Sequence, residues 1–184
     1  MYYLMDWRVN ERELGINLAE IDVTPATGVP WSMGLYCDKK VEQPICLEID
    51  PDSGDAMPDA FLVGIPLFSE KLLAILNKEK VDNIQLYRVE IADKRTSKTF
   101  MNYMAVNIVG KVSCANLEKS RYIEGSGPPL MYFEKLVLNK GISNDYQIFR
   151  LAESSDIIIN ERLANQMMEQ KLVGIRLLAL ESSD

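Results

Sequence analysis

The sequence contains no histidine at all, and this absence excludes more chemistry than any other feature of its composition. Without an imidazole, the chain cannot build a Ser-His-Asp or Cys-His nucleophile, a histidine-ligated zinc site or a histidine proton shuttle. Cysteine is scarce too, because only Cys37, Cys46 and Cys114 are present and no CxxC motif occurs. An odd number of widely spaced thiols indicates reduced cysteines rather than a disulfide framework. We expect Cys46 and Cys114, which lie in apolar runs, to be small core residues.

Long hydrophobic runs are also missing. No stretch of about 18 apolar residues occurs, so we expect no membrane-spanning segment. The first residues, MYYLMDWRVNEREL, lack the basic region and the long apolar run of a signal peptide. Together with the reduced cysteines, these absences predict a cytoplasmic protein.

Basic side chains are in deficit. Lys plus Arg number 20 and Asp plus Glu number 27, which gives a formal charge of −7. Such a chain repels phosphate backbones, so nucleic-acid binding is disfavoured as its main function. An acidic face would attract a basic protein partner and speed the encounter with it. The alternative is that the charge only keeps the protein soluble.

The 184 residues, of which 47% are hydrophobic, predict one domain with a sizeable core. Five prolines between residues 25 and 58 exclude long helices there, so residues 1–55 read as an irregular, strand-rich part. Alternating apolar residues predict a strand at residues 84–91, and residues 100–109, 136–138 and 147–151 also read as strands, with a loop at 123–130. The fold class that we expect is therefore α+β, with mixed or antiparallel sheets and a few short helices.

One segment of the chain resembles another. Residues 67–89 align without gaps on residues 158–180, with five identities over 23 positions at an offset of 91. Ser69 then falls on Asn160, and both are residue types that cap helix N-termini. We expect helices over residues 69–79 and 160–171, each followed by a turn and a strand, as a repeated helix-turn-strand unit. The alternative is that two amphipathic units converged on the same pattern.

Candidate ligand sites are few. The loop at residues 50–59 carries Asp50, Asp52, Asp55 and Asp59, but its glycine and its twelfth position do not fit an EF-hand calcium loop. We expect no metal there. Because loops of this kind are common sites of recognition, the four aspartates are our candidate partner-binding residues. Arg150 lies in an apolar strand, where alternation favours a solvent-facing side chain; an inward-pointing one would need a carboxylate.

Several short runs resemble one known bacterial family. They are Val106-Asn107-Ile108, Leu117-Glu118-Lys119-Ser120, Lys135-Leu136-Val137-Leu138, Ile148-Phe149-Arg150-Leu151, residues 157–163 (IIINERL) and residues 173–176 (VGIR). This family, long filed as a domain of unknown function, is now grouped with the immunity proteins of polymorphic toxin systems. The resemblance runs through residues 100–180, is weaker over 59–91 and does not extend to residues 1–55. We therefore treat residues 59–184 as the family-like part of a single domain.

Three positions depart from the family pattern. Ser113 and Asn116 stand in a stretch where the family often carries acids, and Val173 precedes glycine where the family often has threonine. If these positions contact a toxin, the partner specificity of this chain differs. The resemblance implies no catalytic residue, no metal and no cofactor.

The resemblance implies an immunity protein that binds a cognate bacterial toxin and neutralises it by occlusion. Trp31, Tyr36 and Tyr87 are candidate aromatic anchors for such an interface. Two alternatives remain: a non-catalytic structural or adaptor protein that forms a homodimer, and an enzyme that uses carboxylates alone. A neighbouring toxin gene would favour the first reading and a stable homo-oligomer the second. A pocket of carboxylates with strongly shifted pKa values would favour the third.

Overall fold

The computed structural model describes residues 1–6, 15–22, 25–62, 64–125, 131–142 and 145–183. Within them the helices are α2 (Glu70–Lys78) and α3 (Glu161–Glu169), and the other elements are strands. Mixed and antiparallel sheets with short helices confirm the expected α+β class. No helix in this part of the chain is long and apolar enough to cross a bilayer.

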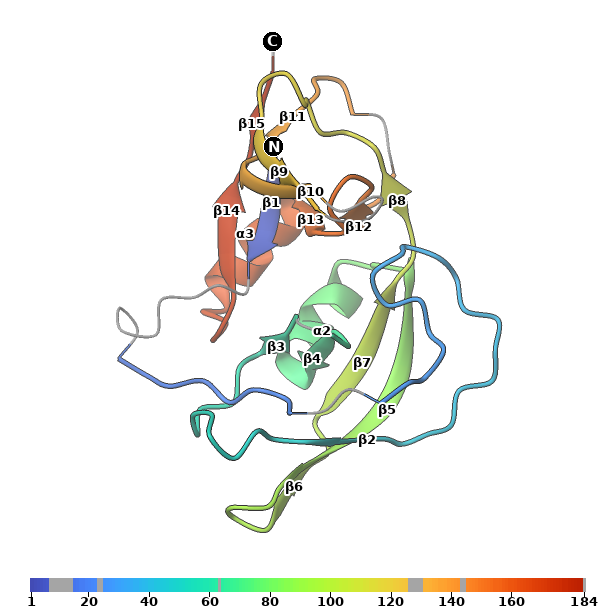
Figure 1. The fold of residues 1–184 in the computed structure, drawn as a ribbon, viewed down its shortest axis with the longest axis vertical. Coiled ribbons are helices and arrows are strands. Elements are labelled where there is room, and N and C mark those ends of the chain that lie inside the picture. The colour runs from blue at the N-terminus through green and yellow to red at the C-terminus, as the bar shows by residue number, and fades with distance from the viewer. Residues whose placement is uncertain (7–14, 23–24, 63, 126–130, 143–144, 184) are drawn as a thin grey trace.

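The first sheet has five strands in the order β14-β1-β13-β12-β8 and occupies the upper half of Figure 1. Its strands are β1 (Tyr2–Asp6), β8 (Lys111–Val112), β12 (Ile148–Leu151), β13 (Ile157–Asn160) and β14 (Arg176–Ala179). Strand β1 is antiparallel to both neighbours, with Tyr3 opposite Ile159 on one side and Ala179 on the other. Strands β13 and β14 therefore run parallel to each other with β1 between them.

The second sheet has the order β2-β5-β7-β4-β3, with β6 paired to β5, and occupies the lower half of Figure 1. Its strands are β2 (Ile45–Glu48), β3 (Ala60–Phe61), β4 (Leu67–Ser69), β5 (Ile84–Asp93), β6 (Lys98–Phe100) and β7 (Tyr103–Ile108). Strand β7 is antiparallel to β4 and to β5, so these two run parallel around it. The strand predicted at residues 100–109 is thus divided between β6 and β7.

Two small sheets complete the fold. They pair β9 (Arg121–Glu124) with β10 (Met131–Lys135), and β11 (Val137–Leu138) with β15 (Glu181–Ser182). The loop predicted at residues 123–130 is wrong at its start, because β9 continues through Glu124. Residues 126–130 of that predicted loop lie outside the described residues.

The helices lie where the sequence predicts them, although each begins one residue later and α3 ends two residues earlier than expected. The Ser69 hydroxyl accepts a hydrogen bond from Leu72 N at 3.3 Å, and Asn160 Oδ1 accepts one from Leu163 N at 2.9 Å. Each such cap stabilises a helix by about 1 kcal/mol. Past the helix ends, Lys80 and Lys171 both take left-handed backbone angles, with φ of 56° and 49°. Both helix predictions are confirmed, and the superposition of the two units stays a prediction.

One core joins the two sheets through both helices. Buried side chains of α2, α3 and the facing sides of both sheets share it, among them Leu72, Phe68, Leu163 and Ile159. The outer face of the second sheet packs under Ala19, Val29 and Cys37, and the outer face of the first packs under Cys114, Ala115 and Leu136. Each sheet is therefore covered on both faces, which explains why β4 and β12 are buried at every position.

This double coverage overturns the expectation for Arg150. Its side chain is only 6% exposed, because the face of β12 that it shares with Ile148 is covered rather than open to solvent. Among the described residues, its guanidinium bonds two backbone carbonyls: Nη1 donates to Ser155 O at 2.9 Å and Nη2 to Trp31 O at 2.7 Å. Burial lowers the pKa of Arg150 to about 10, with Asp156 acting in the opposite direction. The guanidinium thus ties the loop at Trp31 to the first sheet.

Candidate functional site

A short segment, residues 15–22, forms single bridges to Ala56 and Ile49 and shapes a hollow of the molecule. Ala19 N donates to Ala56 O at 2.9 Å, and Gly54 N donates to Leu18 O at 2.8 Å. A Cβ at Gly54 would lie 2.1 Å from Asn17 O, so only glycine allows this close approach. The segment is therefore fixed along the loop that carries three of the predicted aspartates.

The β5–β6 turn holds that loop in place from the other side. Arg95 Nη1 donates to Ser53 O at 2.8 Å and Nη2 to Gly54 O at 3.2 Å, while Nε pairs with Asp93 Oδ1 at 3.0 Å. Asp93 is 6% exposed. The hydrogen bond from Arg95 is the main cause that lowers the Asp93 pKa to about 2. An oriented guanidinium thus fixes the loop backbone.

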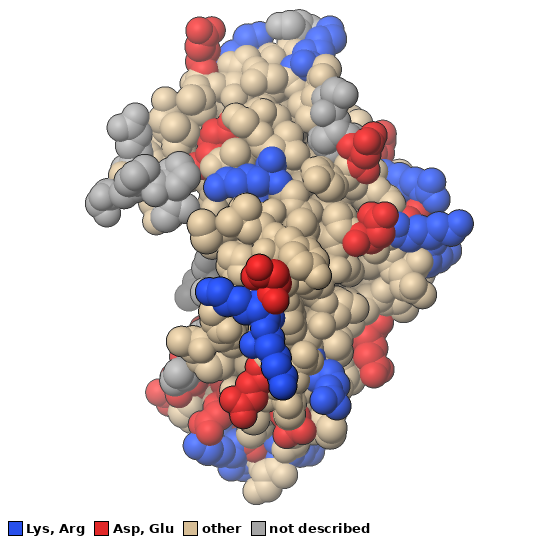
Figure 2. Space-filling view, turned by 90° about the vertical axis from the view of Figure 1, so that its right-hand side faces the viewer, with Lys and Arg blue, Asp and Glu red and all other residues tan. Residues whose placement is uncertain are grey.

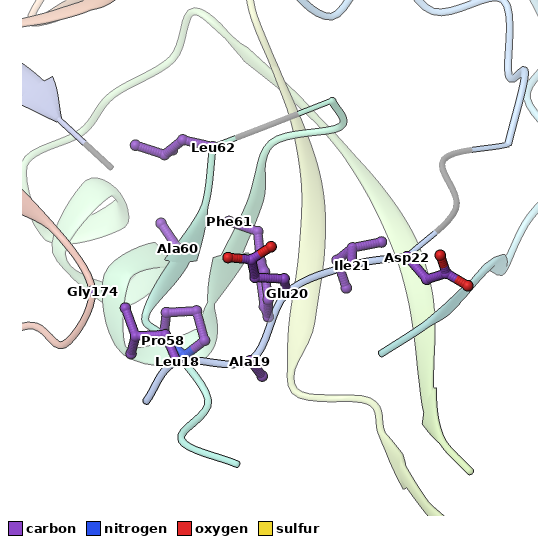
Figure 3. Close-up of a pocket in the computed structure, with 10 residues that line it drawn as sticks. All are labelled: Leu18, Ala19, Glu20, Ile21, Asp22, Pro58, Ala60, Phe61, Leu62 and Gly174. Carbon is purple, nitrogen blue, oxygen red and sulfur yellow. The ribbon is translucent and has the colours of Figure 1, made fainter. Parts of the chain in front are cut away.

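An apolar cavity of about 350 Å³ lies between this segment and strand β3. Figure 3 shows the residues that line it: Leu18, Ala19, Glu20, Ile21, Asp22, Pro58, Ala60, Phe61, Leu62 and Gly174. Gly174 has a φ of +75°, and a Cβ there would lie 2.5 Å from the Pro58 ring. Glycine at this position therefore lets the loop before β14 close one end of the cavity.

A second, polar hollow of about 280 Å³ adjoins the first. It is lined by Asn17, Leu18, Glu20, Asp50, Asp52, Ser53 and Gly54. Leu18 and Glu20 line both hollows, so the segment at residues 18–20 separates an apolar from an acidic side. We call the two hollows together the acidic cleft. Among the described residues, no lysine or arginine lines either part of it.

The structure brings three of the four predicted aspartates together and sets the fourth apart. Asp50 and Asp52 line the acidic cleft, and Asp55 is 93% exposed beside Arg95. Asp59 is only 12% exposed, and its two oxygens accept hydrogen bonds from the Ser69 hydroxyl at 2.7 Å and from Val173 N at 2.8 Å. Asp59 therefore links the start of α2 to the loop before β14.

Glu20 and Asp22 are cleft residues that sequence reasoning missed. No local motif marks them, because the cleft forms only when residues 15–22 lie against a loop some 30 positions further on. The face in Figure 2 shows acidic and basic side chains lying side by side rather than in separate patches. The negative surplus is thus not concentrated on that face.

The three candidate aromatic anchors differ in exposure. Tyr36 is 69% exposed and Trp31 is half-buried, whereas Tyr87 is 7% exposed. Tyr87 belongs to the same core cluster as Val29 and Cys37, and its ring packs edge-on against the Trp31 ring with the ring centroids 5.5 Å apart. Tyr87 is therefore a core residue and not a surface anchor. Burial, followed by the influence of Cys37, raises the Tyr87 pKa to about 12.

The cysteines also separate into buried and exposed. Cys114 is buried as expected, and burial, followed by the charge of Glu153, raises its pKa to about 12. The expectation for Cys46 is wrong, because alternation along β2 turns its thiol to solvent between the buried Ile45 and Leu47. Within the described ranges, no group of three or more His, Cys, Asp and Glu side chains could hold a metal ion.

The comparison with protein families gives a match over nearly the whole chain. The family model described as "Immunity protein family (Imm11)" matches residues 4–182. The match thus takes in most of residues 1–55 as well, including the segment that forms the acidic cleft. A comparison with curated proteins finds no match. Because the family model covers both sheets and both helices, the chain belongs to the Imm11 family of immunity proteins.

Proposed function

We propose that this protein binds a cognate bacterial toxin and neutralises it by covering the toxin's active site or another surface that the toxin needs. The observation that carries the proposal is the match of the immunity family to residues 4–182. The protein would act by binding alone, without catalysis and without a cofactor.

Asp50, Asp52 and Asp55 are the partner-binding residues of this proposal, with Asp59 in a different role. The first three surround the acidic cleft and its rim, where their charges can attract a basic toxin before contact. The Asp59 carboxylate already accepts hydrogen bonds from the Ser69 hydroxyl and from Val173 N, so it would stabilise the loop at the base of the cleft rather than contact the toxin. Rim charges act mainly on the association rate and its salt dependence.

The test is binding to the toxin encoded by the neighbouring gene, measured with purified proteins over a range of salt concentrations. The native chain should bind tightly, and co-expression should protect cells from the toxin. Replacing Asp50, Asp52 and Asp55 with asparagine should slow association and flatten its salt dependence. Asp59→Asn, made separately, should lower thermal stability more than it alters the association rate.

Two results would contradict the proposal at different levels. Unchanged association of the triple variant would remove the loop from the interface and leave the immunity function standing. Failure of the native chain to bind or protect would overturn the immunity function itself. A stable homo-oligomer without toxin binding would then favour the structural or adaptor alternative.

A further inference from the structure

The apolar half of the acidic cleft has fixed walls. The Phe61 ring is 7% exposed and meets the Tyr103 ring edge-on at 5.8 Å. The Tyr103 hydroxyl donates to Pro58 O at 2.8 Å and so anchors the loop that forms one end of the cleft. Packed aromatic walls do not collapse into a space of this size, so the cleft is formed before any partner arrives.

The charges at the cleft have one sign. Figure 3 shows Glu20 projecting from its segment toward Ala60 and Phe61, while Asp22 lies at the other end of the cleft. The nearest arginine that the structure shows bonded to this region, Arg95, is already engaged with Asp93 and with loop carbonyls. The cleft therefore offers apolar walls together with carboxylates that lack a cation among its lining residues.

We propose that the cleft receives one lysine or arginine side chain of the toxin. Its aliphatic stem would lie against Phe61 and Ile21, and its cation would pair with Glu20. Long basic side chains combine these two properties, because their methylene groups can be buried while the charged head is paired. An anionic group would be repelled, and an apolar side chain would leave Glu20 desolvated without a partner. This assignment rests on the proposed toxin binding and names the chemistry of its central contact.

Glu20→Gln tests the charge with little change of shape. If a cation enters the cleft, this variant should raise the dissociation rate of the complex with the neighbouring-gene toxin by roughly 30-fold or more. A matched control is Glu118→Gln, because Glu118 is exposed and lies outside the residues that line the cleft. The control should change the dissociation rate by less than about 3-fold, as rim charges act on association.

Ala60→Leu tests the space without a change of charge. Ala60 lines the cleft and also belongs to the shared core at 3% exposure, so a leucine there would narrow the cavity and press on the core beneath it. The variant should weaken toxin binding while its circular dichroism spectrum stays native. If Ala60→Leu fails to fold, the dissociation rate measured for Glu20→Gln is the test of the cleft.

The basic residue on the toxin is found by replacing each of its lysines and arginines with alanine. One replacement should lose its effect when combined with Glu20→Gln, because the two side chains form one contact. If the native chain binds but Glu20→Gln behaves like Glu118→Gln, the cleft assignment is overturned and toxin binding stands. Additivity with every toxin variant would overturn it as well. Failure of the native chain to bind would overturn both proposals.

Discussion

The unit β4-α2-β5 and the unit β13-α3-β14 have the same connectivity but obtain their central strand differently. In both, a helix joins two parallel strands, and an antiparallel strand lies between them. The first unit takes this strand from β7, which follows β5 closely in sequence. The second takes it from β1, at residues 2–6. The same arrangement of two parallel strands and a helix can therefore receive its central antiparallel strand from nearby in the sequence or from far away.

The two units also differ in the side-chain contacts at the ends of their helices. Arg162, early in α3, donates to Glu79 at the end of α2 at 2.5 Å. Lys71, at the corresponding place in α2, donates instead to the Lys171 carbonyl at 3.3 Å. The position that matches Glu79 at the offset of 91 is Gln170, which offers no carboxylate. The helices thus lie antiparallel, with an ion pair at one end of the contact only.

The largest expected effect tests whether the two units fold together. Leu72 and Leu163 correspond at the offset of 91, and both are fully buried in the shared core. Leu72→Ala and Leu163→Ala should each lower the free energy of unfolding by about 2–5 kcal/mol, with one transition in urea for either variant. Two separate transitions, or a loss confined to one variant, would show that the units are energetically independent.

A second prediction is that the layer covering the second sheet depends on pH through Asp93. The loop at residues 50–55 on the second sheet is held through Asp93, whose pKa is lowered from 3.8 to about 2 by its hydrogen bond with Arg95. A lowered folded-state pKa stabilises the protein fully above pH 3.8, and this contribution is lost as the pH falls from 3.8 to 2. Asp93→Asn should therefore weaken the dependence of urea unfolding on pH in that window.

The control for this prediction is Asp52→Asn, which removes an exposed carboxylate of the same loop. It should leave the hydrogen bonds from Arg95 to Ser53 O and Gly54 O in place, so hydrogen exchange at Gly54 N should stay close to that of the native chain. In the native chain, lowering the pH from 3.8 to 2 should speed hydrogen exchange at Gly54 N more than at Asn116 N. The Asn116 amide donates to the Val137 carbonyl, in the layer that covers the first sheet. Equal acceleration of exchange at the two amides would show that the Asp93–Arg95 pair does not stabilise the loop at residues 50–55 specifically.

The smallest expected effect concerns the residues that follow the helices. Lys80 and Lys171 both have positive φ, where a glycine would remove the steric cost of a Cβ. Lys80→Gly and Lys171→Gly should each raise the free energy of unfolding by about 0.5–1 kcal/mol. Ala74→Gly, at an exposed position within α2, is the control and should lower it by about 1 kcal/mol. If Lys80→Gly and Lys171→Gly changed the free energy of unfolding in opposite directions, the two positions would not be equivalent in the two units.

The sequence allows prediction of those parts of the fold that local interactions determine. Ser69 and Asn160 mark both helix starts, because a capping side chain bonds the backbone three residues ahead. The strand-rich reading of residues 1–55 allows a strand at β1 but does not place it between β13 and β14, since a local pattern does not specify the partner of a strand. The burial of Arg150 was missed for a related reason, as the chain elsewhere decides whether a face is covered. The acidic cleft depends on the same kind of distant contact.

The place of β1 in the first sheet has a consequence for how the protein is made. Residues 2–6 leave the ribosome long before their partners at residues 157–160 and 176–179 are synthesised. The second sheet has no such delay, because β3, β4, β5 and β7 emerge in succession. Since long-range strand pairing is slow, nascent chains should carry an ordered second sheet beside an incomplete first one. The first sheet then closes only after translation has passed residue 179, so its full set of strand pairs forms later than that of the second sheet.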